Sequence, residues 1–483
     1  MAIDKILINS GPGETRVALV EQMRLCELVV TRADAQSFVG NVYLGRVERV
    51  LPAIQAAFVE IGLERAGFLA ASEARHEARP VTDESGGAIS DYVGEGDQVL
   101  VQVQRDPFED KGAKLTMRIS LPGRFLVYTP DQHGIKVSRR IEDEAARARL
   151  TGLLEDLAAD DKGFIVRTSA AEAGDQEFSQ DIQYLCAAWE EIVTARGNHR
   201  APARLHRDLD PALQALRDEG GPDVKKIITD DPQSLSEIKA FCERFAPDLS
   251  PKAELHDGPQ ALFEAHDIEE QIERALSPAA DLASGGDIVI NETAALTAID
   301  VNIGAASEGR GHEETALAVN LEAATAIAQQ IRLRNLSGLI VIDFVSMKRH
   351  GAGEQVLEKF RREMARDSRP AYVVGFTRLG LVEMTRPRRR DSLSHILGGP
   401  CPACQGAGFL KSPESVAFEA LRAVASTSGA ALTLRAAPQV ITALKGPASA
   451  ALKEVEARLG QPLGLEPDAA LPQERYDVVP GNG

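Results

Sequence analysis

The stretch "ALTAIDVNIG" (295–304) decides how the region around it folds. Apolar and polar residues alternate along it, as they do on a strand, and Asp300 is followed two residues later by Asn302. Because side chains alternate along a strand, Asp300 and Asn302 point to the same face. A carboxylate and an amide side by side at a strand end indicate either a turn or a functional site.

A second apolar segment, "SGLIVIDFVSM" (337–347), also delivers an acid, Asp343. Its nearly continuous apolar run predicts a strand buried on both faces. Between the two segments, residues 313–335 carry apolar side chains at helical spacing. A strand–helix–strand unit is an α/β signature, and it brings the ends of its two strands close together.

The two aspartates admit two interpretations. Carboxylates at close range repel each other unless a cation lies between them, and oxygen ligands suit Mg²⁺, which favours phosphoryl chemistry. Alternatively, each aspartate caps the helix or turn that follows its strand. Spacing alone leaves both interpretations open.

The rest of the chain predicts several domains, as its 483 residues allow. Short strands with turn residues between them, up to about residue 106, predict a small barrel. Helices are expected over 142–160, 177–218, 232–244 and 353–367, and the last segment (414–478) alternates between helix and strand. The fold class is therefore α/β and α+β, in several domains.

Composition places the chain among globular proteins, with 44% hydrophobic and 26% charged residues. No apolar run reaches eighteen residues and no signal peptide is recognisable, so we expect a cytoplasmic protein. The formal net charge of −18 argues against nucleic-acid binding. Local basic islands at 137–141, 332–334, 359–363 and 385–390 nevertheless permit it.

Cys401 and Cys404 stand apart from the other three cysteines, because "CPACQGAG" (401–408) is a C-x-x-C followed by glycines. Thiolates at this spacing bind Zn²⁺, but tetrahedral zinc needs four ligands and there is no second C-x-x-C. The pair is a redox couple, a site completed by His395 or another residue, half of a site shared between two chains, or two free structural thiols.

Two further groups are weaker candidates. Phe58 and Phe68 lie in the predicted barrel, where they either stack on nucleic-acid bases or fill the core. Arg167 and Thr168 follow the strand "GFIV", where an arginine and a hydroxyl form a phosphate clamp or simply belong to the surface.

Six blocks together resemble the ribonuclease E/G family: "GNVYLGRVERVLPAIQAAFVEIG", "VRTSA", "TAIDVNIG", "NLEAATAIAQQIRLRNLSGLIVIDF", "GLVEMTRPRRRDSL" and "CPACQGAG". They occur in order along essentially the whole chain, which resembles the family members that lack a long disordered scaffold. The resemblance implies a split RNase H-like subdomain, an S1-type OB insertion, a 5′-sensor, a DNase I-like catalytic subdomain, a zinc link and a small dimerisation domain. The implied boundaries, in that order, are 1–36 with 215–278, 37–118, 119–214, 279–400, 401–413 and 414–483.

The resemblance also implies roles for particular residues. Asp300 and Asp343 match the family's Mg²⁺ ligands, and Asn302 matches an amide that acts at the scissile phosphate. The match also implies a 5′-monophosphate pocket, an RNA-binding face of the OB domain and a zinc link in which two chains give two thiolates each. The 5′-monophosphate pocket would consist of Gly123, Val127, Arg167 and Thr168. The RNA-binding face would consist of Phe58, Phe68 and Lys111, and the zinc link would use Cys401 and Cys404.

Two departures from the family pattern stand out. Ser346 replaces a second acid after Asp343, and the arginine that supports the sensor from the catalytic subdomain has no clear counterpart near "RDSRPAY" (366–372). The function implied is a Mg²⁺-dependent endoribonuclease that cleaves single-stranded RNA, including rRNA precursors and mRNA. It would prefer 5′-monophosphorylated substrates, leave a 5′-phosphate and a 3′-hydroxyl, and assemble as a homodimer or tetramer. A non-catalytic RNA-binding scaffold and a metal-dependent DNase are the rival functions.

Overall fold

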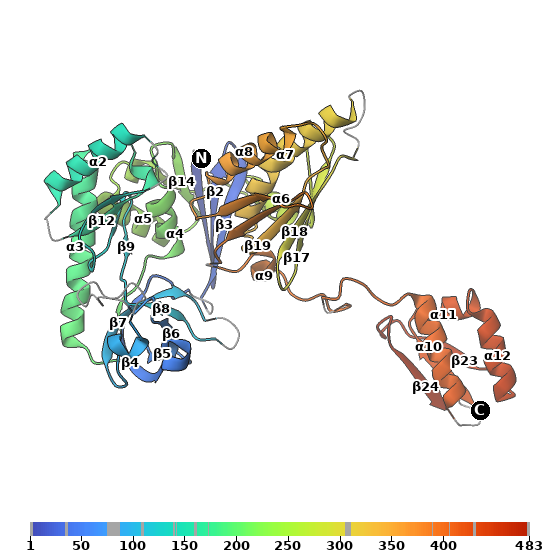
Figure 1. Cartoon of the computed structure of the whole chain (residues 1–483). Helices are drawn as coiled ribbons and strands as arrows, with labels where there is room; N and C mark the ends of the chain where they lie inside the picture. Colours follow the sequence, from blue (N-terminus) through green and yellow to red (C-terminus); the bar gives the residue numbers. More distant parts are fainter. Residues whose placement is uncertain are drawn as a thin grey trace. The chain divides into compact units, whose positions relative to one another are not determined.

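The computed structural model describes residues 3–33, 37–74, 87–107, 111–138, 141, 143–158, 162–171, 173–304, 311–388, 390–404, 406–427 and 431–480. The chain divides into two compact units, residues 1–396 and 397–483 (Figure 1). Nothing in the described residues forms a helix that is both long and apolar enough to cross a membrane.

The first strands of the chain pair with a segment that lies far along the sequence. A five-stranded sheet has the order β15-β14-β1-β2-β3, in which β1 runs antiparallel to β2 and parallel to β14. Apolar residues of β1 and β2 pack against helices α4 and α5. The bounds are β1 (Lys5–Gly11), β2 (Glu14–Glu21), β3 (Arg24–Arg32), α4 (Pro211–Glu219), β14 (Lys226–Thr229), α5 (Pro232–Phe245), β15 (Ala253–Leu255) and α6 (Ile268–Leu276).

The predicted small barrel is confirmed. Five strands close on themselves, because β4 pairs with β5 on one side and with β7 on the other. Closure leaves no free edge among these five strands and encloses an apolar core. The bounds are β4 (Val42–Leu51), β5 (Ala56–Glu60), β6 (Gly67–Ala70), α1 (Ile89–Tyr92), β7 (Gln98–Arg105) and β8 (Lys114–Thr116), and β13 (Ala203–His206) extends the sheet beside β4.

A four-stranded sheet of order β11-β12-β10-β9 follows, with α2 and α3 beside it (Figure 1). The continuous helix expected over 177–218 is wrong, because α3 ends at Asn198 and β13 comes before α4. Pro202 explains the break, since proline and the residue before it disfavour helix. The bounds are β9 (Leu121–Pro122), β10 (Leu126–Tyr128), β11 (Gly134–Val137), α2 (Glu144–Leu157), β12 (Gly163–Val166) and α3 (Asp175–Asn198).

The α/β region is a six-stranded sheet of order β16-β17-β18-β19-β21-β20. Helices α7 and α8 pack together against one face, over inward-pointing residues such as Ile299, Ile342 and Val382 (Figure 1). The bounds are β16 (Ala279–Asp281), β17 (Asp287–Glu292), β18 (Thr297–Asn302), α7 (His312–Leu333), β19 (Gly338–Asp343), α8 (Ala352–Met364), β20 (Tyr372–Phe376), β21 (Leu381–Arg386) and α9 (Leu393–Leu397).

The expectation that β19 is buried on both faces is wrong. Leu339 is 42% exposed and Val341 is half-buried, whereas Ile340 and Ile342 are fully buried. The reason is that α7 and α8 cover only the face to which Ile340 and Ile342 point. The exposed face of β19 also carries apolar residues, so its sequence lacks the alternation of apolar and polar residues that is typical of a half-exposed strand.

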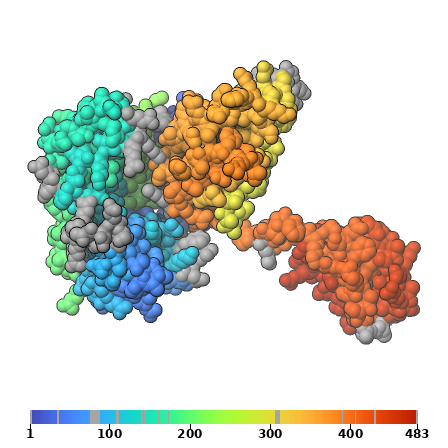
Figure 2. All heavy atoms as spheres, in the orientation of Figure 1, coloured from blue at the N-terminus to red at the C-terminus, as the bar shows by residue number. Residues whose placement is uncertain are grey.

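The C-terminal unit has its own core, formed by three helices on a three-stranded sheet of order β23-β22-β24. Figure 2 shows it in orange and red as a compact body. The α+β alternation expected for this segment is present. The bounds are α10 (Pro413–Ser426), β22 (Leu432–Ala436), α11 (Pro438–Lys445), α12 (Ser449–Leu459), β23 (Gly464–Pro467) and β24 (Tyr476–Pro480).

Candidate active site and nucleic-acid-binding residues

Asp300 and Asp343 lie directly opposite each other on adjacent parallel strands. Strands β18 and β19 pair so that Asp300 is in register with Asp343. Adjacent strands are about 4.8 Å apart, and paired residues point to the same face of the sheet. Both aspartates are exposed on the face that α7 and α8 leave uncovered. The juxtaposition expected from the strand–helix–strand pattern is thus present.

The structure does not support a capping role for either aspartate. The helix after β18 has Gly311 as its N-cap, and the helix after β19 has Gly351. Within the described chain, neither Asp300 nor Asp343 has a hydrogen-bond or ion-pair partner. The register therefore places two carboxylates where they could bind one cation together.

The pair fits Mg²⁺ better than it fits a fully protein-coordinated metal. No group of three or more His, Cys, Asp or Glu side chains with metal-holding geometry exists among the described residues. Mg²⁺ keeps several waters and is commonly held by only one or two carboxylates. The donor set of Asp300 and Asp343 therefore suits a partly hydrated Mg²⁺ ion.

Asn302 ends β18 on the same face as Asp300 and is half-buried. Its Nδ2 donates a hydrogen bond of 3.2 Å to Oδ2 of Asp287, the residue opposite it on β17. The carboxylate, the amide and the second carboxylate therefore occupy one end of the sheet, as the sequence predicted.

The four candidate sensor residues meet where β10 pairs with β12. Val127 lies opposite Ile165, and Arg167 follows the end of β12. The Nη1 of Arg167 donates to the backbone oxygen of Gly123 at 2.7 Å. Thr168 is exposed, and its hydroxyl lies 3.2 Å from that of Ser138. The structure thus brings the side chain of Arg167 to the backbone of Gly123, which lies 44 residues earlier in the sequence.

Phe58 and Phe68 are neighbours on paired strands β5 and β6. Their ring centroids are 6.1 Å apart at an interplanar angle of 72°, which is an edge-to-face contact. Both are half-buried and neither belongs to the barrel core, which argues against their being simple core residues. Lys111 is exposed and lies three residues before Lys114, the register partner of Phe68.

Cys401 and Cys404 lie in the segment that precedes α10. Cys401 is exposed, and hydrogen bonds from the backbone N–H groups of Cys404 and Ala403 and from the Cys404 side chain lower the pKa of its thiol. A lowered pKa favours the thiolate, the form that binds metal. His395 uses its Nδ1 in a 2.8 Å contact with Ser392. Among the described residues, no third His, Cys, Asp or Glu joins these two thiols in a metal-binding group.

Comparison with known proteins decides the family. The model of the ribonuclease E/G family matches residues 120–389, and that of the RNase E/G thioredoxin-like domain matches residues 400–480. Ribonuclease G of Haemophilus influenzae is 38% identical over 98% of this chain and 99% of its own length. Ribonuclease G of Escherichia coli K12 is 37% identical over the same shares. The chain belongs to the ribonuclease E/G family.

Relatives in the family differ in length. Ribonuclease E of a Nostoc species is 38% identical over 81% of this chain but only 57% of its own length. The recognition made from six short blocks is confirmed, and for Ribonuclease G the similarity extends over both chains almost completely.

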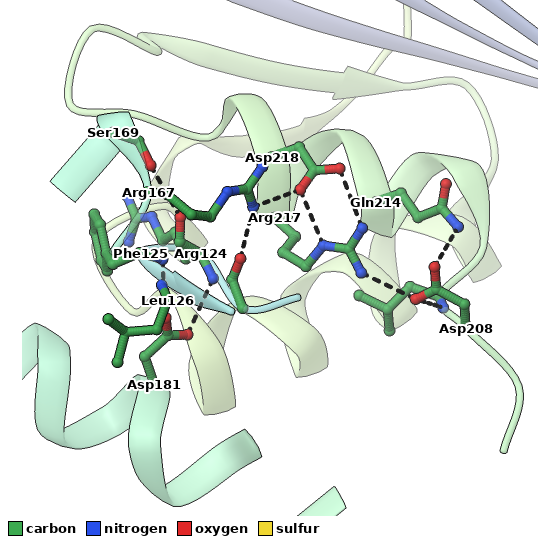
Figure 3. A network of polar contacts seen from close by, with 12 residues as sticks. Arg124, Phe125, Leu126, Arg167, Ser169, Asp181, Asp208, Gln214, Arg217 and Asp218 are labelled. Atoms are coloured by element: carbon green, nitrogen blue, oxygen red, sulfur yellow. Dashed lines mark hydrogen bonds and ion pairs between the residues drawn. The ribbon is translucent and has the colours of Figure 1, made fainter. Parts of the chain in front are cut away.

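No sequence pattern singled out Asp181, the residue that fixes the backbone loop beside the candidate sensor residues Gly123 and Val127. Asp181 of α3 is 3% exposed, and its carboxylate accepts the backbone N–H groups of Arg124, Phe125 and Leu126 at 2.7–3.0 Å (Figure 3). Burial raises the pKa of Asp181, while these three hydrogen bonds act to lower it. Nothing in the sequence around a helical aspartate indicates that its side chain binds the backbone of a distant loop.

The ion pairs that hold Arg167 were likewise not predictable from the sequence. Asp218 of α4 accepts the Nη1 of Arg167 at 2.7 Å and also pairs with Arg217, which reaches Asp208 at 2.9 Å (Figure 3). Burial acts to raise the pKa of Asp218, but Arg217 and Arg167 prevail and lower it. Arg167 is therefore held by a carboxylate of helix α4, which lies outside the sheet that carries Arg167.

The basic islands divide into structural and surface groups. Arg332, Arg334 and Arg386 are at most 7% exposed, and Arg386 pairs with buried Asp367 at 2.7 Å. These arginines are buried within the region that carries β18 and β19 and present no basic surface. Arg361 and Arg362 are exposed on α8. The island at 137–141 includes two arginines outside the described residues.

Proposed function

We propose that the chain is a Mg²⁺-dependent endoribonuclease that cleaves single-stranded RNA. The observation that carries this proposal is the register of Asp300 with Asp343, two exposed carboxylates that have no partner among the described residues. Family membership supports the choice of RNA as substrate, since the full-length relatives are named Ribonuclease G.

Asp300 and Asp343 would hold the metal, and Asn302 would orient the scissile phosphate by donating an N–H to one of its oxygens. When bound, Mg²⁺ supplies an acidified water and neutralises the charge that develops on the phosphate. Water adds to phosphorus and the bond to the 3′ oxygen breaks, which leaves a 3′-hydroxyl and a 5′-phosphate.

Recognition of the 5′ end would lie with Gly123, Val127, Arg167 and Thr168. Arg167 offers the charged donors and Thr168 the hydroxyl that a terminal phosphate needs. A 5′-monophosphate carries more charge than an internal phosphodiester, so a guanidinium held in place by Asp218 would favour it. This supports a preference for 5′-monophosphorylated RNA.

The barrel would bind the single strand. Phe58 and Phe68 present half-exposed rings side by side, and Lys111 adds a nearby cation. Base stacking on such rings tolerates any sequence, which suits a nuclease that acts on rRNA precursors and mRNA.

The chain would work as a homodimer or tetramer in the cytoplasm. Cys401 and Cys404 of two chains would give the four thiolates of one structural zinc site. We assign each segment the role that the family resemblance implies. The segments are RNase H-like (1–36 with 215–278), S1-type (37–118), 5′-sensor (119–214), DNase I-like (279–400), zinc link (401–413) and dimerisation domain (414–483).

The test replaces each metal-binding aspartate by its neutral isostere. Asp300→Asn and Asp343→Asn are expected to lower cleavage of a short single-stranded RNA at least 100-fold, as EDTA should do for the unaltered chain, while RNA binding by the barrel persists. The matched control is Glu358→Gln, which removes one exposed acid from α8 on the other side of the sheet. Full cleavage by either aspartate variant contradicts the proposal.

The same assay separates the rival functions. DNA of the same sequence, digested in parallel, should remain intact. Cleavage of DNA alone would make the chain a DNase, and tight RNA binding without any Mg²⁺-dependent cleavage would make it a binding scaffold.

A further inference from the structure

Asp287 is a third acid at the end of the sheet that carries Asp300 and Asp343, and no sequence pattern singles it out. It begins β17 and lies opposite Asn302 in the antiparallel pairing of β17 with β18. Its Oδ2 accepts the Nδ2 of Asn302 at 3.2 Å, and both side chains are half-buried.

This contact fixes which way the Asn302 amide points. An ionised carboxylate only accepts hydrogen bonds, so the amide nitrogen must face Asp287. The amide oxygen and the second N–H are then directed elsewhere. Without Asp287 the amide could rotate by half a turn and exchange its donor for its acceptor.

The backbone beneath Asn302 is fixed as well. A Cβ on Gly286, the residue before Asp287, would lie 2.4 Å from the backbone oxygen of Asn302. Gly304 has a φ of +54°, and a Cβ there would lie 2.4 Å from the backbone oxygen of Gly285. Only glycines allow this close approach, so the turn before β17 and the end of β18 form one tightly packed unit.

Asp287 is placed to act on Asn302 and not on the metal. Its partner in the sheet is Asn302, whereas Asp300 lies opposite Val289. Such a diagonal neighbour is about 7–8 Å away, and the Asp287 carboxylate is hydrogen-bonded to the Asn302 amide instead. The absence of any three-residue metal-binding group among the described residues agrees with this.

We propose that Asp287 is a positioning residue that holds the Asn302 amide in the orientation needed at the scissile phosphate. This inference rests on the proposed function of Asp300, Asn302 and Asp343. Asp287 touches neither substrate nor metal and acts only through the hydrogen bond to Asn302.

A double-mutant cycle tests the inference. Asp287→Ala is expected to lower kcat about 10-fold with KM for RNA and the half-saturating Mg²⁺ concentration unchanged within about 2-fold, because only the orientation of one group is lost. In the Asn302→Ala background, Asp287→Ala should have no further effect on kcat. Circular dichroism and the melting temperature verify that each variant is folded.

Two comparison variants sharpen the cycle. Asp287→Asn keeps an oxygen acceptor for Asn302, so it should recover most of the activity that Asp287→Ala loses. Glu358→Ala is the matched control, because Glu358 is an exposed acid on α8, which covers the other face of the sheet, and its loss should leave kcat unchanged.

Additive losses in the Asn302→Ala background, or a shifted Mg²⁺ requirement in Asp287→Ala, would overturn the inference in favour of a charge effect on the metal. If the unaltered chain fails to cleave RNA, the proposed function fails. The hydrogen bond is then tested by NMR on the Asn302 side-chain amide signal, identified by its disappearance in Asn302→Ala. That signal should shift in Asp287→Ala, and an unchanged signal overturns the inference.

Discussion

At the scale of single residues, Gly123 shows how little room the proposed sensor pocket leaves. A Cβ at Gly123 would lie 2.4 Å from Oδ1 and 2.6 Å from Oδ2 of Asp181. That carboxylate cannot move aside without giving up the backbone N–H groups of Arg124, Phe125 and Leu126. Gly123 is therefore required by the buried acid beneath it.

Gly123→Ala is accordingly expected to displace the loop that carries Arg124–Leu126 and to reduce the preference for 5′-monophosphorylated RNA at least 5-fold. Cleavage of the same RNA with a 5′-hydroxyl should stay within about 2-fold, because the Asp300–Asp343 pair lies on another sheet. The measurement is kcat/KM on both substrates. Gly152→Ala on α2 is the control, since no atom lies within 4 Å of its added Cβ. An unchanged preference would show that the pocket does not read the 5′ end.

The candidate site was largely predictable at this scale, for a physical reason. Asp300 and Asp343 are conspicuous because an acid at the end of an apolar strand has no structural need to be there, and strand pairing brings both to one place. Asp181, Asp218 and Asp287 were not predictable. Each acts through a contact with a residue that is distant in sequence, and helix or strand periodicity does not reveal such contacts.

At the scale of elements, the sequence predicted which segments form helices better than where they pack. The helices expected over 142–160 and 232–244 agree closely with α2 and α5. The expectations for 177–218 and for β19 failed. In the first, Pro202 outweighed helical periodicity, and in the second, an apolar side chain such as Leu339 lies on an open face. Burial depends on which face the helices cover, and periodicity does not contain that information.

Helix α4 also touches the segment before β20, and Glu219 at its end makes that contact sensitive to pH. Burial, the Glu27 carboxylate and Asp218 raise the pKa of Glu219 to about 7, while Arg167 and a hydrogen bond with Ser368 act to lower it. Glu27 in turn pairs with Arg369 at 2.8 Å. Strand β3, helix α4 and the start of β20 thus meet around one group of charges.

Glu219 is expected to make the folded chain more stable at pH 5.5 than at pH 8.5. A raised pKa means that the folded state binds the proton more tightly than the unfolded state, so the stabilisation is lost as pH rises from about 4.5 to 7. The contribution is of the order of 1–3 kcal/mol. The measurement is the melting temperature of unit 1–396 within the full chain at both pH values. Glu219→Gln should reduce the difference, and an equal difference in the variant would refute this role.

At the scale of the whole molecule, the C-x-x-C pair Cys401 and Cys404 is the feature that could join two chains. Cys401 and Cys404 lie at the start of the C-terminal unit, where Cys401 is exposed and Cys404 is half-buried, and neither forms a disulfide. Within the part of the chain that the structure describes, no further metal-binding side chain joins these two thiols, whereas a structural zinc site requires four ligands. Two chains would complete the site and would be joined by it.

Cys401→Ser is therefore expected to abolish zinc binding and to convert the dimer or tetramer into smaller species. The unaltered protein should contain about one zinc per two chains, because each chain supplies two of the four ligands. Elemental analysis and light scattering measure the two quantities on the same sample. Cys186→Ser is the control, since that thiol lies on α3, contacts Lys162 at 3.2 Å and belongs to no C-x-x-C. If the mass in solution is unchanged in Cys401→Ser, the chains are held together by other surfaces. If instead one zinc is found per chain, each chain completes its own site.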